Sequence, residues 1–260
     1  MTGIHSSAEK LLTAWEISKP LRASDQSLNW NDAAIGRAVQ AELDLLMTAA
    51  GRRRVGWKVG LTSPAALAAF GADEPMVGVI YEDSVLRSGA TLHMSRCCSP
   101  RIEGEILLEI GTPPIAGADD ISLLASIASV RGAFEIADSR IDGWPRQIGR
   151  AIADNACCGF VVPGIVLLDP ASTDFSSVAM KLTSGSETLS EGTGSASMGS
   201  VLQLYRWFVE TSAIGGRDIR KGDIILTGAL GPAISMAAQK NYTLHIDGFE
   251  TATLKTDGNA

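Results

Sequence analysis

The sequence has 260 residues, 45% hydrophobic and 20% charged, a composition typical of a globular protein with one or two domains. It contains 22 basic and 29 acidic residues, which gives a formal net charge of −7. Proteins that bind nucleic acid usually carry a basic surplus or stripe. The only basic cluster here is Arg52, Arg53 and Arg54, which we interpret as a solvated helix end. We therefore expect neither nucleic acid nor an anionic membrane surface as a partner.

Targeting signals and metal-binding cysteines are also not expected. The first ten residues lack the apolar core of a signal peptide. The longest uncharged stretches, 155–168 and 224–239, are broken by proline and glycine and are shorter than the ~18–20 apolar residues of a membrane helix. The cysteines form two adjacent pairs without zinc-site spacing, so we interpret them as free thiols. These features predict a cytoplasmic protein.

The hydrophobic pattern predicts an α+β fold. Apolar residues at helical spacing indicate a helix over 32–50, ended by Gly51. Short apolar runs separated by turn residues indicate strands at 55–61, 78–81, 101–110, 133–136, 160–162, 165–168, 224–226 and 242–246. Further helices are expected at 64–70, 121–130 and 200–212. The pattern predicts a mainly β core over 55–260 and a helical amino-terminal region over 1–54.

The strand predicted at 101–110 has two different faces, because side chains alternate along a strand. One face is apolar and runs from Ile102 to Ile110. The other carries Glu103 and Glu105, whose Cα atoms should lie ~6.5–7 Å apart. Taken alone, these glutamates are also explained by a solvated face at a sheet edge.

A third carboxylate favours a metal site. Glu135 lies in the apolar segment 132–137, and a buried carboxylate is costly unless it is paired or metal-bound. Carboxylates from two strands would satisfy one another through a shared cation. Ligation by oxygen alone favours a hard divalent ion, Mg²⁺ or Mn²⁺, over zinc. Octahedral coordination would leave about three positions for water or a chelating substrate.

Lys58 is the candidate cation of this site. It lies in an apolar strand between Gly56 and Gly60. Its ammonium group either extends to solvent or faces the carboxylates, where it would bind an anionic substrate or move a proton. Beside a bound metal we expect burial to lower its pKa. The glycine-rich segment 191–199 does not fit a nucleotide-binding loop, and we interpret it as a turn before the helix at 200–212.

Five segments, in this order, resemble the 2-keto-4-pentenoate hydratase family of the fumarylacetoacetate hydrolase superfamily. They are GWKVGLT (56–62), PRIEGEI (100–106), FEIADSRI (134–141), ADNACCG (153–159) and GDIILTGALG (222–231). The resemblance covers about residues 55–250. It implies a mixed, rolled and barrel-like β core behind a helical amino-terminal region. It also implies hydration of a 2-hydroxy-2,4-dienoate to a 4-hydroxy-2-oxoacid in the meta-cleavage catabolism of aromatic compounds.

The resemblance also implies roles for individual residues. The Mg²⁺ or Mn²⁺ ligands would be Glu103, Glu105 and Glu135, and Lys58 would be the active-site lysine. The implied substrate-binding residues are Phe70, Met76, Cys157 and Thr227. Met76 replaces a commonly acidic residue and Cys157 a common serine, so the pocket should be less polar than in relatives. Asp138 and Arg140 are interpreted as structural support for a strand end.

Other activities remain open. A metal-dependent decarboxylase of 2-oxo-3-enedioates, such as 4-oxalocrotonate, would use nearly the same site. A catalytically silent partner subunit is a further alternative, which the three glutamates disfavour. A hydrolase of carbon–carbon bonds is disfavoured because no His–Glu pair can be assigned. The resemblance implies a homo-oligomer that takes a small 2-oxo or 2-hydroxy acid, and a related decarboxylase or a downstream aldolase as partner enzyme.

Overall fold

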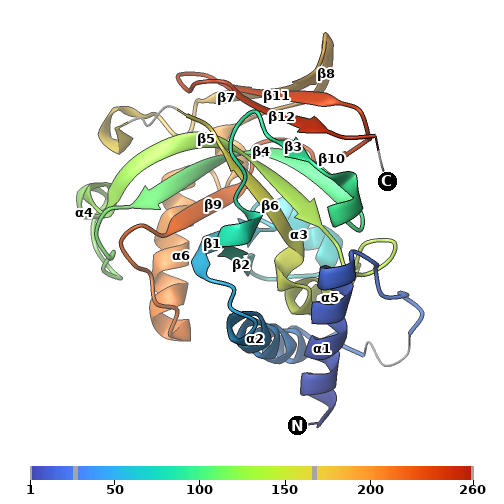
Figure 1. Ribbon diagram of the computed structural model, residues 1–260. Helices are drawn as coiled ribbons and strands as arrows, with labels where there is room; N and C mark the ends of the chain where they lie inside the picture. The colour runs from blue at the N-terminus through green and yellow to red at the C-terminus, as the bar shows by residue number, and fades with distance from the viewer. Residues whose placement is uncertain (1, 26–28, 166–168, 259–260) are drawn as a thin grey trace.

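The computed structural model describes residues 2–25, 29–165 and 169–258. Its helices are α1 (Thr2–Ile17), α2 (Ala33–Ala49), α3 (Pro64–Phe70), α4 (Asp120–Ala125), α5 (Ile148–Ala153) and α6 (Val201–Gly215). The larger sheet contains β1 (Arg54–Gly60), β2 (Met76–Tyr81), β4 (Pro100–Ile110), β5 (Ile127–Asp138), β6 (Cys158–Pro163), β9 (Ile224–Ala229) and β10 (Ile234–Ser235). The smaller sheet contains β3 (Thr91–Leu92), β7 (Ala179–Ser184), β8 (Glu187–Thr193), β11 (Asn241–Ile246) and β12 (Ala252–Thr256). The predicted α+β class is confirmed (Figure 1).

The larger sheet is rolled. Its strand order is β2-β1-β9-β4-β5-β6, with β10 paired to β4. The chain that follows β2 returns to the opposite edge, where Val85 forms a bridge with Val161 of β6. The amide of Leu86 donates a hydrogen bond to the Val161 carbonyl at 2.8 Å. One end of the roll is filled by a buried apolar cluster of Ile80, Leu107, Ala133, Cys158, Val161 and Leu226. The expected barrel-like core is therefore present.

The smaller sheet covers the outer face of β4 (Figure 1). Ile102 and Ile106 pack there in the same buried cluster as Leu244 of β11. Gly104 lies between them, and a Cβ at this position would meet Leu244 Cδ1 at 2.6 Å. The two sheets therefore approach each other closely at a position where β4 has no side chain. The apolar face predicted for this strand is the face between the sheets.

The amino-terminal helices pack at the other end of the molecule from the smaller sheet (Figure 1). Helix α2 matches the predicted 32–50 helix: the Asp32 carboxylate accepts a hydrogen bond from the Ala34 amide at 2.7 Å and caps its start. Helix α2 contacts α5 so closely that a Cβ on Gly36 would lie 2.3 Å from the Gly149 carbonyl oxygen. Among the described residues, none of the helices combines the length and the apolar character needed to cross a membrane.

Two regions differ from the sequence expectations. The helix predicted over 121–130 is wrong beyond Ala125, since α4 ends there and β5 begins at Ile127. The apolar residues of 127–130 belong to a long strand that pairs with β4, and this pairing outweighs the local helical spacing. Helix α1 was expected only as part of a helical amino-terminal region, and helix α5 and strands β3, β7, β8, β10 and β12 were not predicted. The strand predicted at 165–168 lies outside the described residues, except for Ile165, which forms a bend.

Candidate functional site

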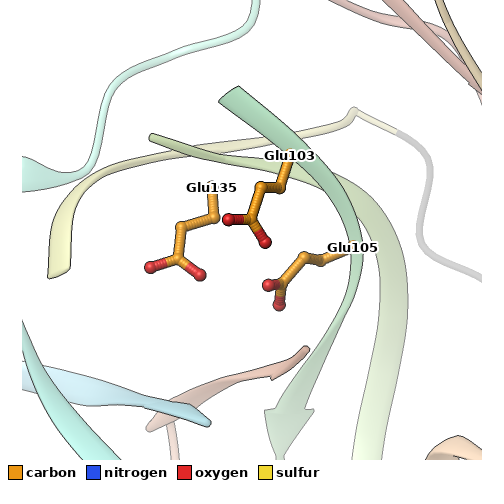
Figure 2. A group of neighbouring side chains, drawn as sticks. All are labelled: Glu103, Glu105 and Glu135. Atoms are coloured by element: carbon orange, nitrogen blue, oxygen red, sulfur yellow. The ribbon is translucent and has the colours of Figure 1, made fainter. Parts of the chain in front are cut away.

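Three glutamates converge inside the rolled sheet. Strands β4 and β5 pair antiparallel with Glu103 directly opposite Glu135, and Glu105 projects from the same face of β4 two residues later. One carboxylate oxygen from each of the three lies within 4.8 Å of the other two. Figure 2 shows the carboxylates pointing toward a common centre. Glu105 and Glu135 are each 1% exposed, so water cannot compensate their charges.

The electrostatics of the three carboxylates favour a bound cation. Burial and the negative charges of Glu135 and Glu103 raise the pKa of Glu105 well above its usual range. Burial and Glu135 likewise raise the pKa of Glu103 to about 7. The backbone amide of Gly228 fixes Glu105 by donating a hydrogen bond to Oε2 at 2.8 Å. Three crowded hard oxygen donors fit a divalent ion, which would offset their repulsion.

Lys58 lies inside the roll beside these carboxylates. It is 4% exposed, and its Nζ lies 3.0 Å from Glu135 Oε1, an ion-pair distance without hydrogen-bond geometry. The solvent-directed alternative for this lysine is therefore wrong. Burial is the largest single effect and disfavours the ammonium, but the negative charges around it, led by Glu135 and including Glu103, together outweigh burial, and the pKa of Lys58 is raised. The lowered pKa expected for Lys58 depended on a bound cation that cancels the charge of the carboxylates. Without such a cation, the carboxylates raise this pKa.

The carboxylates and Lys58 line a cavity of about 700 Å³. Of the predicted substrate-binding residues, Phe70, Met76 and Cys157 also line it. They belong to one apolar cluster with Leu61 and Trp144, which forms part of the cavity wall. The low polarity expected from Met76 and Cys157 is therefore present at this wall.

The structure does not bring Thr227 to the cavity. Its side chain is fully buried, and its hydroxyl donates a hydrogen bond to the Ile106 carbonyl at 2.9 Å. Its own carbonyl accepts a hydrogen bond from the Ser197 hydroxyl. Thr227 instead holds β9 against β4 immediately before Gly228, the residue that anchors Glu105. Thr227 therefore does not line the cavity, and the substrate contact that the resemblance implies for it stays a prediction.

A left-handed turn places Cys157 at the cavity. Asn155, Ala156 and Cys157 have φ values of 51°, 53° and 55°, a conformation that costs free energy in residues other than glycine. The Asn155 side chain compensates this cost, since it accepts a hydrogen bond from the Val79 amide at 2.7 Å and donates one to the Val79 carbonyl at 2.9 Å. The turn lies directly against Gly78, where a Cβ would meet the Asn155 carbonyl oxygen at 2.4 Å. No periodicity in the sequence indicates such a turn.

The predicted structural role of Asp138 and Arg140 agrees with their contacts. The Asp138 carboxylate accepts hydrogen bonds from the backbone amides of Cys98 and Ser99, at 3.0 and 2.6 Å. Arg140 is 2% exposed, and its Nε donates to the buried carboxylate of Asp154 at 2.6 Å. These contacts fix the end of β5 and the chain that leads into the left-handed turn.

All four cysteines are free thiols, as predicted.

Gly228 provides a test of how the carboxylates are held. It has φ +88°, and a Cβ there would lie 2.3 Å from Thr62 Oγ1. We expect Gly228→Ala to shift the amide that donates to Glu105, and to weaken Mg²⁺ binding about 10- to 100-fold, as is usual when a partner of a metal ligand is lost. Isothermal titration with Mg²⁺ measures the effect. Gly222→Ala is the matched control, because its φ is +86° and nothing lies within 4 Å of its Cβ. Equal Mg²⁺ affinities in the two variants would contradict the assigned role of Gly228.

The family follows from comparison with known proteins. The sequence profile described as fumarylacetoacetate (FAA) hydrolase C-terminal matches residues 58–255. The chain therefore belongs to the fumarylacetoacetate hydrolase family, with relatives named as 2-keto-4-pentenoate hydratases. The 2-keto-4-pentenoate hydratase of Paraburkholderia phymatum is 32% identical over 94% of each chain. The 2-hydroxyhexa-2,4-dienoate hydratase of Comamonas testosteroni is 31% identical over 81% of each.

A solved structure shows the same fold. The 4-oxalocrotonate decarboxylase of Pseudomonas putida G7, in complex with magnesium and adipate, superposes with a TM-score of 0.91. The two chains are 24% identical, and the superposition covers 97% of each. The rolled sheet, the smaller sheet and the helical region are thus shared with this enzyme.

Proposed function

We propose that the protein is a divalent-metal-dependent hydratase, a hydro-lyase that adds water to a 2-hydroxy-2,4-dienoate in its 2-oxo form. The product is a 4-hydroxy-2-oxoacid, in the meta-cleavage catabolism of aromatic compounds. The observation that carries the proposal is the convergence of Glu103, Glu105 and Glu135 beside the Lys58 ammonium, on the wall of one cavity. The hydratases that are 31–32% identical over most of the chain support the reaction type.

Some residues of the cavity supply charged groups, and others limit the access of water. Glu103, Glu105 and Glu135 would hold Mg²⁺ or Mn²⁺, the ions that three hard oxygen donors prefer. When bound, the ion supplies Lewis-acid polarisation of the substrate's 2-oxo group. Lys58 Nζ lies at the edge of this centre, where it can hold the substrate's negative charge or move a proton at its carbon chain. The apolar wall that includes Met76 limits the access of bulk water to the carbon chain of the substrate.

The test is an ultraviolet assay of the loss of a 2-hydroxy-2,4-dienoate, in chelator and with Mg²⁺ or Mn²⁺ restored. We expect turnover only with the ion, and a product with the carbon count of the substrate. Full activity in chelator would contradict the proposed metal dependence. Release of one CO₂ per substrate would instead identify a decarboxylase, and the absence of any turnover would favour a silent subunit.

The proposal extends to the setting of the enzyme. We propose a homo-oligomer in the cytoplasm that takes a small 2-oxo or 2-hydroxy acid. A related decarboxylase or a downstream aldolase would be its partner in the same reaction sequence. The support is chemical: a dienoate is a product expected of ring cleavage, and a 4-hydroxy-2-oxoacid is a substrate for aldol cleavage.

A further inference from the structure

Arg101 is a cation in the cavity to which the mechanism above gives no role. It lies two residues before Glu103 on the same face of β4, so its side chain also projects into the roll. It lines the cavity and is half-buried. Its guanidinium carbon lies 4.3 Å from the centroid of the Trp144 ring, so the group stacks on the indole.

Trp144 is a fixed platform for this guanidinium. Its indole Nε1 donates hydrogen bonds to the carbonyl and the hydroxyl of Ser99, at 3.1 and 3.0 Å. Its φ of 61° is unusual for a bulky residue, so the surrounding structure imposes its position. Both residues of the stack line the cavity. A cation is therefore held in one place at the cavity wall.

Stacking leaves the in-plane N–H groups of an arginine available as donors. Within the described ranges, the Arg101 guanidinium forms no hydrogen bond or ion pair with another residue. Two arginines with restricted exposure differ from it: Arg54 pairs with Asp223, and Arg140 pairs with Asp154. The positive charge of Arg101 lowers the pKa of Glu103, although burial has the larger and opposite effect. Glu103 does not form an ion pair with Arg101. The unpaired N–H donors of Arg101 at the cavity wall therefore indicate a role in ligand binding.

We propose that Arg101, positioned by Trp144, is a carboxylate-binding subsite of this cavity. The planar guanidinium would hold a carboxylate of the substrate through two parallel N–H···O hydrogen bonds. Two carboxylates could occupy it: the one beside the 2-oxo group, or a second one at the far end of a dicarboxylic substrate. The inference rests on the proposed function for the class of ligand, a 2-oxo acid.

The test measures binding rather than turnover, so that it stands apart from the assay of the reaction. The probes are 2-oxopentanoate, with one carboxylate, and 2-oxoadipate, with two, titrated calorimetrically in saturating Mg²⁺. We expect Arg101→Met to weaken binding about 10- to 100-fold, the usual loss for a hydrogen-bonded charge. Arg101→Lys keeps the charge but not the paired donors, so its loss should be smaller. Trp144→Phe removes the anchor to Ser99 and should also weaken binding.

The pattern of losses identifies the carboxylate. A similar loss for both probes would assign Arg101 to the carboxylate beside the 2-oxo group, and a loss for 2-oxoadipate alone would assign it to the far end. Arg87→Met is the matched control, since Arg87 is exposed and away from the cavity; its affinities should be unchanged.

Three outcomes would overturn the subsite. They are unchanged affinity of Arg101→Met and Arg101→Lys for both probes, an equal loss in Arg87→Met, or no binding of either probe to the unaltered protein. The Mg²⁺ affinity of each variant, measured in the same way, reports whether the carboxylate centre is intact. If the protein binds these acids through Arg101 but hydrates no dienoate, the proposed function fails and the subsite stands.

Discussion

Glu105→Gln is expected to abolish Mg²⁺ binding and metal-dependent turnover without destabilising the protein. Loss of a partner of a metal ligand costs about 10- to 100-fold in affinity, so loss of a ligand charge should exceed that range. The raised pKa of Glu105 shows that its ionised form is unfavourable among burial, Glu135 and Glu103. A neutral glutamine mimics the protonated side chain, so the metal-free variant should unfold at the same temperature as the unaltered protein or higher. Calorimetric titration and thermal unfolding measure the two effects.

Thermal unfolding with and without Mg²⁺ also distinguishes the unaltered protein from the variant. Mg²⁺ at 100 times its Kd should stabilise the unaltered protein by about 2.7 kcal/mol and leave the variant unchanged. Glu109→Gln is the matched control: Glu109 lies on the same strand but outside the cavity, where it pairs with Arg131 at 2.9 Å. A Glu105→Gln variant that retains Mg²⁺-dependent turnover, or a Glu109→Gln variant that loses it, would contradict the assignment of the centre.

Arg140→Met is expected to give a large loss of stability. Arg140 donates to the Asp154 carboxylate through Nε at 2.6 Å and to the Asp154 and Cys158 carbonyls at 2.7 and 2.8 Å. Asp154 is fully buried, so the variant would leave its carboxylate without a counter-charge, although the backbone amide of residue 140 would still donate to it. Such a loss costs about 3–5 kcal/mol, which corresponds to a fall in Tm of about 6 to 20 °C for a chain of this size. Thermal unfolding followed by circular dichroism measures it.

A surface pair provides the contrast for this prediction. Arg53 pairs with Glu82, and both side chains are more than half exposed. Arg53→Met should leave Tm unchanged, because exposed ion pairs add little to stability. The double variant Arg140→Met/Asp154→Leu should recover part of the loss, since it removes the buried charge together with its partner. Equal Tm values for Arg140→Met and the unaltered protein would refute the importance of this buried pair.

The carboxylate centre could be predicted from the sequence because it depends on short-range rules. Alternation on one strand places Glu103 and Glu105 on one face, and the apolar surroundings of Glu135 place it inside. The same rule applied one step further would have found Arg101, which shares the face of Glu103. Arginine side chains are mostly exposed in proteins, and only the fold shows that this face is the interior of a roll.

Other features of the site depend on long-range contacts that no local pattern encodes. The left-handed turn at Asn155 is stabilised by Val79, 76 residues away in the sequence. Thr227 was assigned to the substrate from its motif, but it holds two strands together because its hydroxyl meets the Ile106 carbonyl. Strand β5 begins in a segment with helical spacing, since its partner β4 decides its conformation. In each case the deciding partner is distant in sequence.

The contact at Gly104 couples the smaller sheet to the chemistry of the cavity. A slip of β4 by one residue would turn Glu103 and Glu105 out of the roll and bring their apolar neighbours into it. Leu244 and Met180 of the smaller sheet fit against Gly104, where any larger side chain would collide with them. Contact with the smaller sheet thus helps to fix the register of β4. Insertions or deletions in β7 or β11 should therefore change the affinity for the metal, although neither strand supplies a ligand to the centre.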